Sequence, residues 1–378
     1  MGRFALSPAE DGRIKAAQIV GNARMGGVVS CVMNYYSHMD RSRYRFDFFT
    51  YGPSALDERL KELDPAARVF TIPPFDGAFW KAVPALKKLL QAGGYAIAHS
   101  HLTTLSAFAL RAAKSAGVPV RICHAHSTFD RQSDHYIVKK ILRPFAAKCA
   151  TDIAACGEYA AENLYGKRAD GAFILRNAIE LNRFSYDADA KRKLGLKGKI
   201  FLFVGRFVPQ KNLFFLLEAF ARARAKSNHV PIKLALMGDG PQREGLAARA
   251  EALQISEDVL WVPPGDPALW YSAADAFCLP SLYEGFPVVG VEAQASGLFC
   301  LFSDKIAREA DVCGNGSFLP LDADVWAEAL LQAHARAGNA AEKLRSAGFD
   351  IGREADRLTA FYDRALKKAG IALQYRGE

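Results

Sequence analysis

Short hydrophobic runs alternate with amphipathic stretches along almost the whole chain. In the first half, strands are predicted at IKAAQIVG, YRFDFFTYG, ARVFTIP, YAIAHSH, PVRICHAH, TDIAACG and AFILRNA. In the second half, they are predicted at IFLFVGRF, IKLALMGDG, DVLWVPP, DAFCLPS and LFCLFSD. Stretches with helical periodicity lie between them. Regular alternation of this kind predicts an α/β fold, in which helices cover both faces of parallel sheets.

A charged stretch, DADAKRKLGLKGK, separates the two series of strands and indicates two domains. We expect an N-terminal domain over residues 1–180 and a C-terminal domain over 181–357, with a last helix at about 358–378 that packs back on the first. Ligands of parallel sheets gather at the carboxyl ends of the strands. With two such domains, the cleft between them is the expected site.

The composition is typical of a soluble globular protein, with 50% hydrophobic and 24% charged residues. No secretion signal is expected, because the start of the chain lacks an apolar core. Residues 89–110 carry no charge, but QAGG interrupts them, so they are predicted as a strand and a helix instead of a membrane span. The seven cysteines form no C-x-x-C pair, which favours reduced thiols and a cytoplasmic location.

Positive charge is concentrated in the first half of the chain. Residues 81–148 contain 11 lysines and arginines but only 2 acidic residues, which indicates an anionic partner. Within HYIVKKILRPFAAKCA, the cations Lys139, Lys140 and Arg143 alternate with aromatic and aliphatic residues, as in a helix at an anionic membrane surface. A solvated basic face is the alternative. Nucleic acid is not expected, because no known binding module is present.

The stretch PSLYEGFPVVGVEAQASG contains two carboxylates, Glu284 and Glu292, eight residues apart. In a continuous helix they would be about 800° apart and would not share a face. Proline suits the first turn of a helix, so we expect a helix to begin at Pro287 with Glu284 in the loop before it. The backbone N–H groups at residues 285–288 would then form an anion site.

Other polar residues are predicted at strand ends of the same domain. Arg206 follows IFLFVG and Lys211 opens the next helix, so the two cations are suited to a diphosphate, although both could be ordinary surface charges. Gly238, in MGDGP, would let a ligand approach closely. Glu292 is placed to accept hydrogen bonds from a ribose. These features together indicate a pocket for a nucleoside diphosphate.

Four histidines, His99, His101, His124 and His126, end predicted strands of the N-terminal domain. Polar roles in the cleft are the expected function, and hydrogen-bonded core histidines are the alternative. A metal site is not expected, because no carboxylate or cysteine completes a set of ligands.

At these residues the chain resembles the retaining glycosyltransferases of family 4, which have the GT-B fold of two facing Rossmann-like domains with a deep cleft. The resemblance rests on VGRFVPQKN, LMGDGP and PSLYEGFPVVGVEAQASG. GNARMGGVVSCVMNYY, HSHLTTLSAF, VRICHAHS, LRNAIELNRF and FSDKIAREA are similar to the branch that builds capsule and exopolysaccharide. Two departures are WVPPGDP, with prolines where glycine is common, and Ala178 in RNAIE, where Asn-Gly is usual.

The resemblance implies roles for individual residues. Glu284 and His124 would face the transferred sugar as catalytic residues, and His101 and His126 would line the acceptor side of the cleft. Arg206 and Lys211 would bind the donor diphosphate, and Glu292 would bind the ribose. The remaining implied donor contacts are Gly26, Gly27, Gly238, Gly285, Phe286, Pro287 and Val288.

The implied reaction is transfer of a sugar, with retention and without a metal or other cofactor, from a nucleotide sugar (a UDP-sugar is favoured). The acceptor would be a glycan or a polyprenyl-diphosphate-linked sugar at the inner face of the cell membrane, where the protein would bind peripherally. Two alternatives are a sugar-nucleotide 2-epimerase of the same fold and a non-catalytic polysaccharide- or membrane-binding protein.

Overall fold

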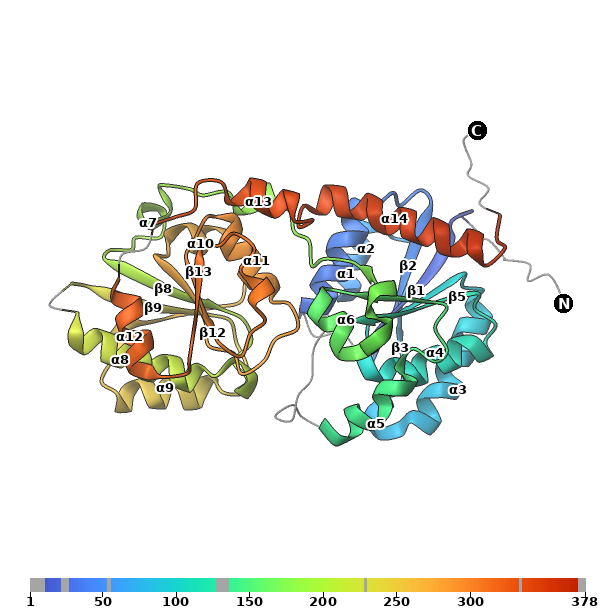
Figure 1. The fold of residues 1–378 in the computed structure, drawn as a ribbon, viewed down its shortest axis with the longest axis horizontal. Coiled ribbons are helices and arrows are strands. Elements are labelled where there is room, and N and C mark those ends of the chain that lie inside the picture. Colours follow the sequence, from blue (N-terminus) through green and yellow to red (C-terminus); the bar gives the residue numbers. More distant parts are fainter. Residues whose placement is uncertain are drawn as a thin grey trace. The chain divides into compact units, whose positions relative to one another are not determined.

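The computed structural model describes residues 11–21, 27–52, 56–126, 136–227, 230–332 and 335–372 (Figure 1). The chain divides into two compact units. The N-terminal unit contains Met1–Ala178 together with Ile351–Glu378, and the C-terminal unit is Ile179–Asp350. The boundary lies at 178/179, where we expected 180/181, and the chain returns to the first unit at Ile351, where we expected about 358.

The N-terminal unit is built on a seven-stranded parallel sheet in the order β3-β2-β1-β4-β5-β6-β7. Its strands are β1 (Ile14–Gly21), β2 (Tyr44–Thr50), β3 (Val69–Thr71), β4 (Ile97–Ser100), β5 (Val120–Ala125), β6 (Asp152–Ala155) and β7 (Phe173–Ile174). Its helices are α1 (Gly27–His38), α2 (Leu56–Leu63), α3 (Phe75–Gly93), α4 (Ser106–Ser115), α5 (Tyr136–Ala146), α6 (Glu158–Tyr165) and α14 (Ile351–Lys368).

Helices cover both faces of this sheet and form two separate cores (Figure 1). One core joins α1, α2 and α14 to the sheet, and the other joins α3 and α4 to it. The buried side chains alternate along β1, since Ala16 belongs to the first core and Ala17 to the second. A strand with both faces covered is hydrophobic throughout, which explains why the strands are readable as continuous apolar runs.

Helix α14 returns to the N-terminal unit because its apolar side belongs to that core. Leu358, Tyr362 and Leu366, spaced by four residues, are buried with residues of β1 and α1. Burying a large apolar side chain contributes roughly 1.5–3 kcal/mol. Its buried residues start at Ile351, so the whole helix, and not only its last part, belongs to the N-terminal unit.

The C-terminal unit is built on a six-stranded parallel sheet in the order β10-β9-β8-β11-β12-β13. Its strands are β8 (Lys199–Val204), β9 (Ile232–Met237), β10 (Val259–Val262), β11 (Ala276–Leu279), β12 (Cys300–Ser303) and β13 (Gly316–Leu319). Its helices are α7 (Ala190–Lys193), α8 (Leu213–Lys226), α9 (Arg243–Ala252), α10 (Ala268–Ala273), α11 (Val288–Ala295), α12 (Ala323–Leu331) and α13 (Ala340–Ser346). Strand β13 is absent from our prediction, because its four half-buried residues give no clear apolar run.

In each sheet the strand order reverses at one point, between β1 and β4 and between β8 and β11. The loops that leave adjacent strands diverge at such a switch point, and ligands of α/β proteins bind there. The predicted site residues follow these strands or their neighbours. No helix in the described ranges is both long and apolar enough to span a membrane. All seven cysteines are free thiols.

Candidate active site

The loops that follow β8 and β11 are hydrogen-bonded to each other. Leu282 N donates to the carbonyl of Gln210 at 2.9 Å, and Gln210 Nε2 donates to the carbonyl of Tyr283 at 2.8 Å. Gln210 thus holds the two loops together at the switch point of the C-terminal sheet. Gln210 is absent from the predicted site, because a glutamine in a loop belongs to no recognisable sequence pattern.

This contact brings Lys211 and Glu284 together. Lys211 Nζ lies 2.5 Å from Glu284 Oε1, and the two side chains are only 16% and 9% exposed. The cation and the carboxylate, which we expected to contact different parts of a ligand, therefore form an ion pair with each other. Arg206, the second predicted cation, is exposed on the loop after β8.

The packing of the backbone explains why residue 238 is a glycine. Its φ is +144°, and a Cβ there would lie 1.9 Å from the carbonyl oxygen of Gly205. Only glycine allows the ends of β8 and β9 to approach this closely. The backbone of Gly205 is therefore one close neighbour of Gly238, and the approach of a ligand to this glycine stays a prediction.

Helix α11 begins at Val288, one residue later than predicted. Pro287 has φ −76° and ψ 106°, an extended conformation, and therefore occupies the N-cap position. Since proline has no N–H, the backbone N–H groups nearest this helix start belong to Gly285, Phe286 and Val288. The ring of Phe286 stacks on Phe349 at 5.2 Å and holds the loop.

Glu292 lies in the second turn of α11 and accepts a hydrogen bond from Tyr271 Oη at 3.0 Å. Burial raises the pKa of Glu292 to about 7, against the lowering effect of the Tyr271 hydroxyl. This carboxyl group therefore changes its charge near neutral pH. Tyr271 is a site residue that the sequence did not reveal, because it lies in another helix, α10.

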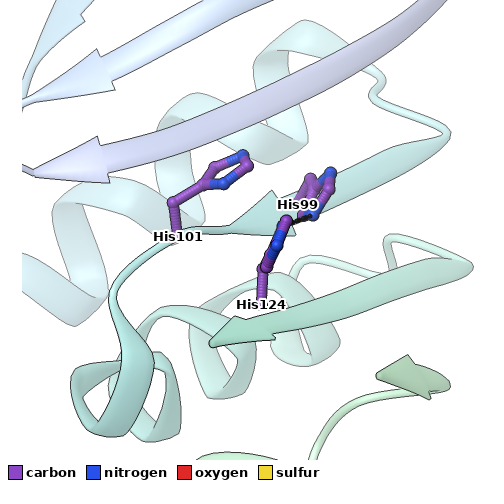
Figure 2. Close-up of side chains that lie close together, drawn as sticks. All are labelled: His99, His101 and His124. Carbon is purple, nitrogen blue, oxygen red and sulfur yellow. Dashed lines mark hydrogen bonds between the residues drawn. The ribbon is translucent and has the colours of Figure 1, made fainter. Parts of the chain in front are cut away.

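The four predicted histidines of the N-terminal unit lie together at the ends of β4 and β5. All are buried, with exposed fractions of 1%, 6%, 0% and 8% for His99, His101, His124 and His126. Figure 2 shows three of these rings, with a hydrogen bond of 3.0 Å between His99 Nε2 and His124 Nδ1. The four rings are therefore buried and hydrogen-bonded, which both the expected polar role and the alternative of core histidines would require.

Two further residues, Gln18 on β1 and Tyr362 on α14, belong to this cluster. Gln18 Oε1 lies 2.9 Å from His101 Nε2, and Tyr362 Oη lies 2.8 Å from His99 Nδ1. Gln18 could have been recognised as the one polar residue inside the apolar run AAQIV. Tyr362 could not, since it is far away in the sequence.

Burial keeps these imidazoles neutral. It lowers the pKa of His126 to about 3 and holds the pKa values of the other three well below 6.5, with the neighbouring imidazoles contributing. His99, His101 and His124 each have a nitrogen within 4.8 Å of the others. His99 Nε2 and His124 Nδ1 are 3.0 Å apart, which is a hydrogen-bond distance.

The remaining predicted residues lie in the N-terminal unit. Gly27 begins α1, with open space where a side chain would be. Gly26 lies outside the described residues. Arg143 does not simply face outward, since its guanidinium donates to the carbonyls of Glu162 and Leu164 at 3.2 and 3.3 Å and ties α5 to the end of α6.

Two family models match this chain in succession. Residues 25–183 match "Glycosyltransferase Family 4" and residues 187–348 match "Glycosyl transferases group 1". The protein named "Putative glycosyltransferase EpsF" of Bacillus subtilis is 32% identical over 94% of this chain and 97% of its own length. UDP-Gal:alpha-D-GlcNAc-diphosphoundecaprenol alpha-1,3-galactosyltransferase of Escherichia coli is 29% identical over 77% of this chain and 80% of its own.

Solved structures show the same architecture. Anabaena HepE in complex with UDP-glucose superposes with a TM-score of 0.78 at 17% identity, covering 93% of this chain and all of HepE. Sucrose-phosphate synthase of Thermosynechococcus elongatus superposes with a TM-score of 0.76 at 21% identity, covering 94% of this chain and all of that one. The fold is therefore GT-B, as predicted, and the protein is a glycosyltransferase.

The chain belongs to glycosyltransferase family 4. Its likeness to EpsF and to the undecaprenol-linked galactosyltransferase confirms the predicted similarity to the exopolysaccharide-type branch.

Proposed function

We propose that the protein transfers a sugar from a UDP-sugar to a glycan or a polyprenyl-diphosphate-linked acceptor during synthesis of a bacterial surface polysaccharide. The observation that carries this proposal is the pairing of Lys211 with Glu284 beside the start of α11, at the switch point of the C-terminal sheet. The HepE structures contain UDP and UDP-glucose, and the E. coli relative is named for a UDP-Gal donor and a lipid-linked acceptor. These names support the choice of substrates.

The donor diphosphate would bind Arg206, Lys211 and the N–H groups near the start of α11. Lys211 is paired with Glu284, and a diphosphate would compete for its ammonium group. Glu284 would then face the transferred sugar. Glu292 would accept hydrogen bonds from the ribose, and Gly238 and Gly205 would hold the loop ends in place.

The chemical step needs stabilisation of the negative charge that grows on the leaving diphosphate. Arg206, Lys211 and the start of α11 would provide it. The acceptor hydroxyl would attack the anomeric carbon from the side of the leaving group, which retains the configuration, and its proton would pass to the departing phosphate oxygen. The bond from the anomeric carbon to that oxygen breaks as the bond to the acceptor oxygen forms, so no protein base is required.

We infer that the reaction is independent of metal ions, because fixed cations would supply the charge that a metal provides elsewhere. Activity with a UDP-sugar is therefore expected to be unchanged in excess EDTA. A full loss on chelation that Mg²⁺ or Mn²⁺ restores would contradict this inference.

The acceptor would bind the N-terminal unit, with His124 near the transferred sugar and His101 and His126 on the acceptor side. Helix α5 would bring this unit to the inner face of the cell membrane. Ile137 and Ile141, which are 71% and 62% exposed, lie on its surface with Phe145, 48% exposed, one turn further. Lys140 is exposed beside them. A helix with apolar and basic residues on its exposed side is typical of binding at an anionic membrane surface.

Product analysis tests the proposal. The protein would be incubated with UDP-glucose or UDP-galactose, with and without a GlcNAc-diphosphoundecaprenol acceptor, and the Glu284→Gln variant would serve as the control. Transfer that needs the acceptor and is lost in the variant is the expected result. Conversion of the donor alone would instead indicate an epimerase, and no binding of any nucleotide would indicate a non-catalytic protein.

A further inference from the structure

A single buried amide lies at the centre of a hydrogen-bonded chain that contains His99, His101, His124 and His126. Gln18 Oε1 is 2.9 Å from His101 Nε2, and Gln18 Nε2 is 3.2 Å from Tyr362 Oη. One arm of the chain therefore starts at the oxygen of this amide and the other at its nitrogen. Gln18 is fully buried on β1, between the helix α14 and the strand β4 that carry these partners.

The rings in this chain are neutral. Among the described residues, the small cavity at the cluster has no aspartate, glutamate, lysine or arginine in its lining, which combines Gln18, the four histidines and Tyr362 with apolar side chains. A neutral imidazole has one N–H donor and one bare nitrogen that accepts. The direction of one hydrogen bond therefore dictates the direction of the next.

The first arm begins at the amide oxygen, which can only accept. His101 must donate to it from Nε2, so His101 Nδ1 carries no proton. That bare nitrogen accepts from His126 Nε2, at a distance of 2.7 Å. His126 is then left with a bare Nδ1.

The second arm begins at the amide nitrogen, which can only donate. Its donation to Tyr362 Oη turns the phenol hydrogen toward His99 Nδ1, 2.8 Å away. His99 consequently carries its proton on Nε2 and donates it to His124 Nδ1, 3.0 Å away. His124 is left with its proton on Nε2.

This Nε2–H group is a buried donor that has no hydrogen-bond partner among the residues that the structure describes. Buried polar groups in proteins are almost always paired, so an orphan donor indicates a ligand or a water. The cavity that His124 lines measures about 10 Å³, which is room for about one water-sized group. A hydroxyl oxygen has the required size and accepts hydrogen bonds.

We propose that Gln18 and Tyr362 are positioning residues that hold His124 as a neutral hydrogen-bond donor, with its N–H directed to an oxygen of the substrate, and that His124 does not act as a base. The identity of that oxygen, a hydroxyl of the transferred sugar or of the acceptor, rests on the proposed function. The tautomer itself does not, because it follows from contacts within the N-terminal unit.

Nitrogen-15 NMR of the histidine rings tests the tautomers on the protein alone, without substrate. We expect the proton of His124 on Nε2 and that of His101 also on Nε2. If the Gln18 amide were turned by 180°, every proton in both arms would move, and His124 would carry its proton on Nδ1. That result, or a cationic His124 at neutral pH, would overturn the proposal.

Variants of the two positioning residues sharpen the test. Tyr362→Phe removes the hydroxyl that donates to His99, so His124 is expected to populate both tautomers. Tyr36→Phe is the matched control, since its hydroxyl lies in the same core but bonds to Asp64, and it should leave the histidine spectrum unchanged. An unchanged His124 in Tyr362→Phe would contradict the proposal.

Gln18→Leu gives an independent test. The side chain of leucine neither donates nor accepts a hydrogen bond, so neither arm keeps a fixed starting point, and His101 and His124 are expected to populate both tautomers. A purely structural role of Gln18 predicts no such mixture, and unchanged tautomers in the folded variant would overturn the assignment.

Kinetics connect the tautomer to the reaction. In Tyr362→Phe we expect kcat to fall roughly tenfold, because one hydrogen bond to the reacting sugar is weakened, while the donor KM stays within about twofold. If the NMR result holds but no sugar transfer is detected with any donor, the proposed function fails and the tautomer assignment stands. If transfer occurs but the tautomers are reversed, only this inference fails.

Discussion

In both units, polar residues lie at the switch point of a parallel sheet, but these residues are charged in one unit and neutral in the other. In the C-terminal unit the switch point between β8 and β11 holds an ion pair, Lys211 with Glu284. In the N-terminal unit the switch point between β1 and β4 adjoins four neutral imidazoles and an amide. One fold therefore carries a charged site and an uncharged one.

The difference follows from burial and partners. Glu284 is buried, yet it stays next to a cation. Among the residues that the structure describes, the four histidine rings have only each other, Gln18 and Tyr362 as hydrogen-bond partners. A buried group without an opposite charge loses its own charge. The comparison indicates that the C-terminal unit is suited to an anion and the N-terminal unit to neutral hydroxyl groups.

The largest effect is expected at the carboxylates of the charged site. Glu284→Gln should lower kcat about 100-fold, since it removes a charge beside the reacting sugar. It should not raise the donor KM, because Lys211 is released.

Glu292→Gln should mainly raise the donor KM, since a ribose contact exists before and during the reaction. Steady-state kinetics of both variants is the measurement, and interchanged effects would reverse these roles.

The second largest effect is expected when a cation of the charged site, Lys211 or Arg206, is removed. Lys211→Ala and Arg206→Ala should each weaken UDP binding by about 1.5–3 kcal/mol, the loss of one charge-assisted hydrogen bond. Lys211→Ala should also lower the melting temperature, because it leaves Glu284 buried without its partner, whereas Arg206 is exposed and its removal should not. Calorimetry and thermal unfolding separate the two effects. Unchanged UDP affinity in both variants would contradict the proposed binding of the diphosphate by Lys211 and Arg206.

A smaller effect is expected from pH. Glu292 must be ionised to accept well from a ribose, and its pKa is about 7, so UDP affinity should fall up to about tenfold per unit as pH drops below 7. Glu292→Gln should abolish this dependence. Tyr271→Phe should move the midpoint upward, because the hydroxyl of Tyr271 lowers the pKa.

The same carboxyl group also affects stability. Its pKa is about 7 in the folded protein and 4.5 without perturbation, so between these values the folded state holds more protons than the unfolded state. The free energy of unfolding should therefore fall as pH rises from about 4.5 to about 7. A rise over this window that depends on Glu292 would contradict the cause given for the shift.

The smallest effect concerns the surface of the N-terminal unit. Lys140→Ser with Ile141→Ser should weaken sedimentation with anionic vesicles, since one cation near such a surface contributes about 1 kcal/mol. High salt should have a similar effect on the unchanged protein. UDP affinity should not change.

The matched control for this variant is Lys114→Ser with Val230→Ser, which replaces one exposed cation and one exposed apolar residue elsewhere. It should bind vesicles like the unchanged protein. Lys139 and Arg143 were also expected to face the membrane, but Arg143 ties α5 to α6, so its replacement would mix a structural effect with the loss of charge. If the unchanged protein does not sediment with the vesicles at low salt, the basic face is only a solvated surface.

Much of the fold could be predicted from local patterns. Strands buried on both faces are continuous apolar runs, so β1, β5 and β8 were recognisable in the sequence. The half-buried β13 was not. The predicted start of α11 was wrong by one residue, because proline is compatible both with a first helical turn and with the extended N-cap that Pro287 adopts.

The chemistry of single positions was likewise determined by the sequence. The histidines and the carboxylates were placed at strand ends and helix starts, because residue type and local periodicity are sufficient for that. Which groups meet was decided by the tertiary structure alone. Lys211 and Glu284 are 73 residues apart in the sequence, and His99 and Tyr362 are 263 apart. Charge state and tautomer depend on such partners and on burial, which no local pattern encodes, so only the folded chain shows that one site is ionic and the other neutral.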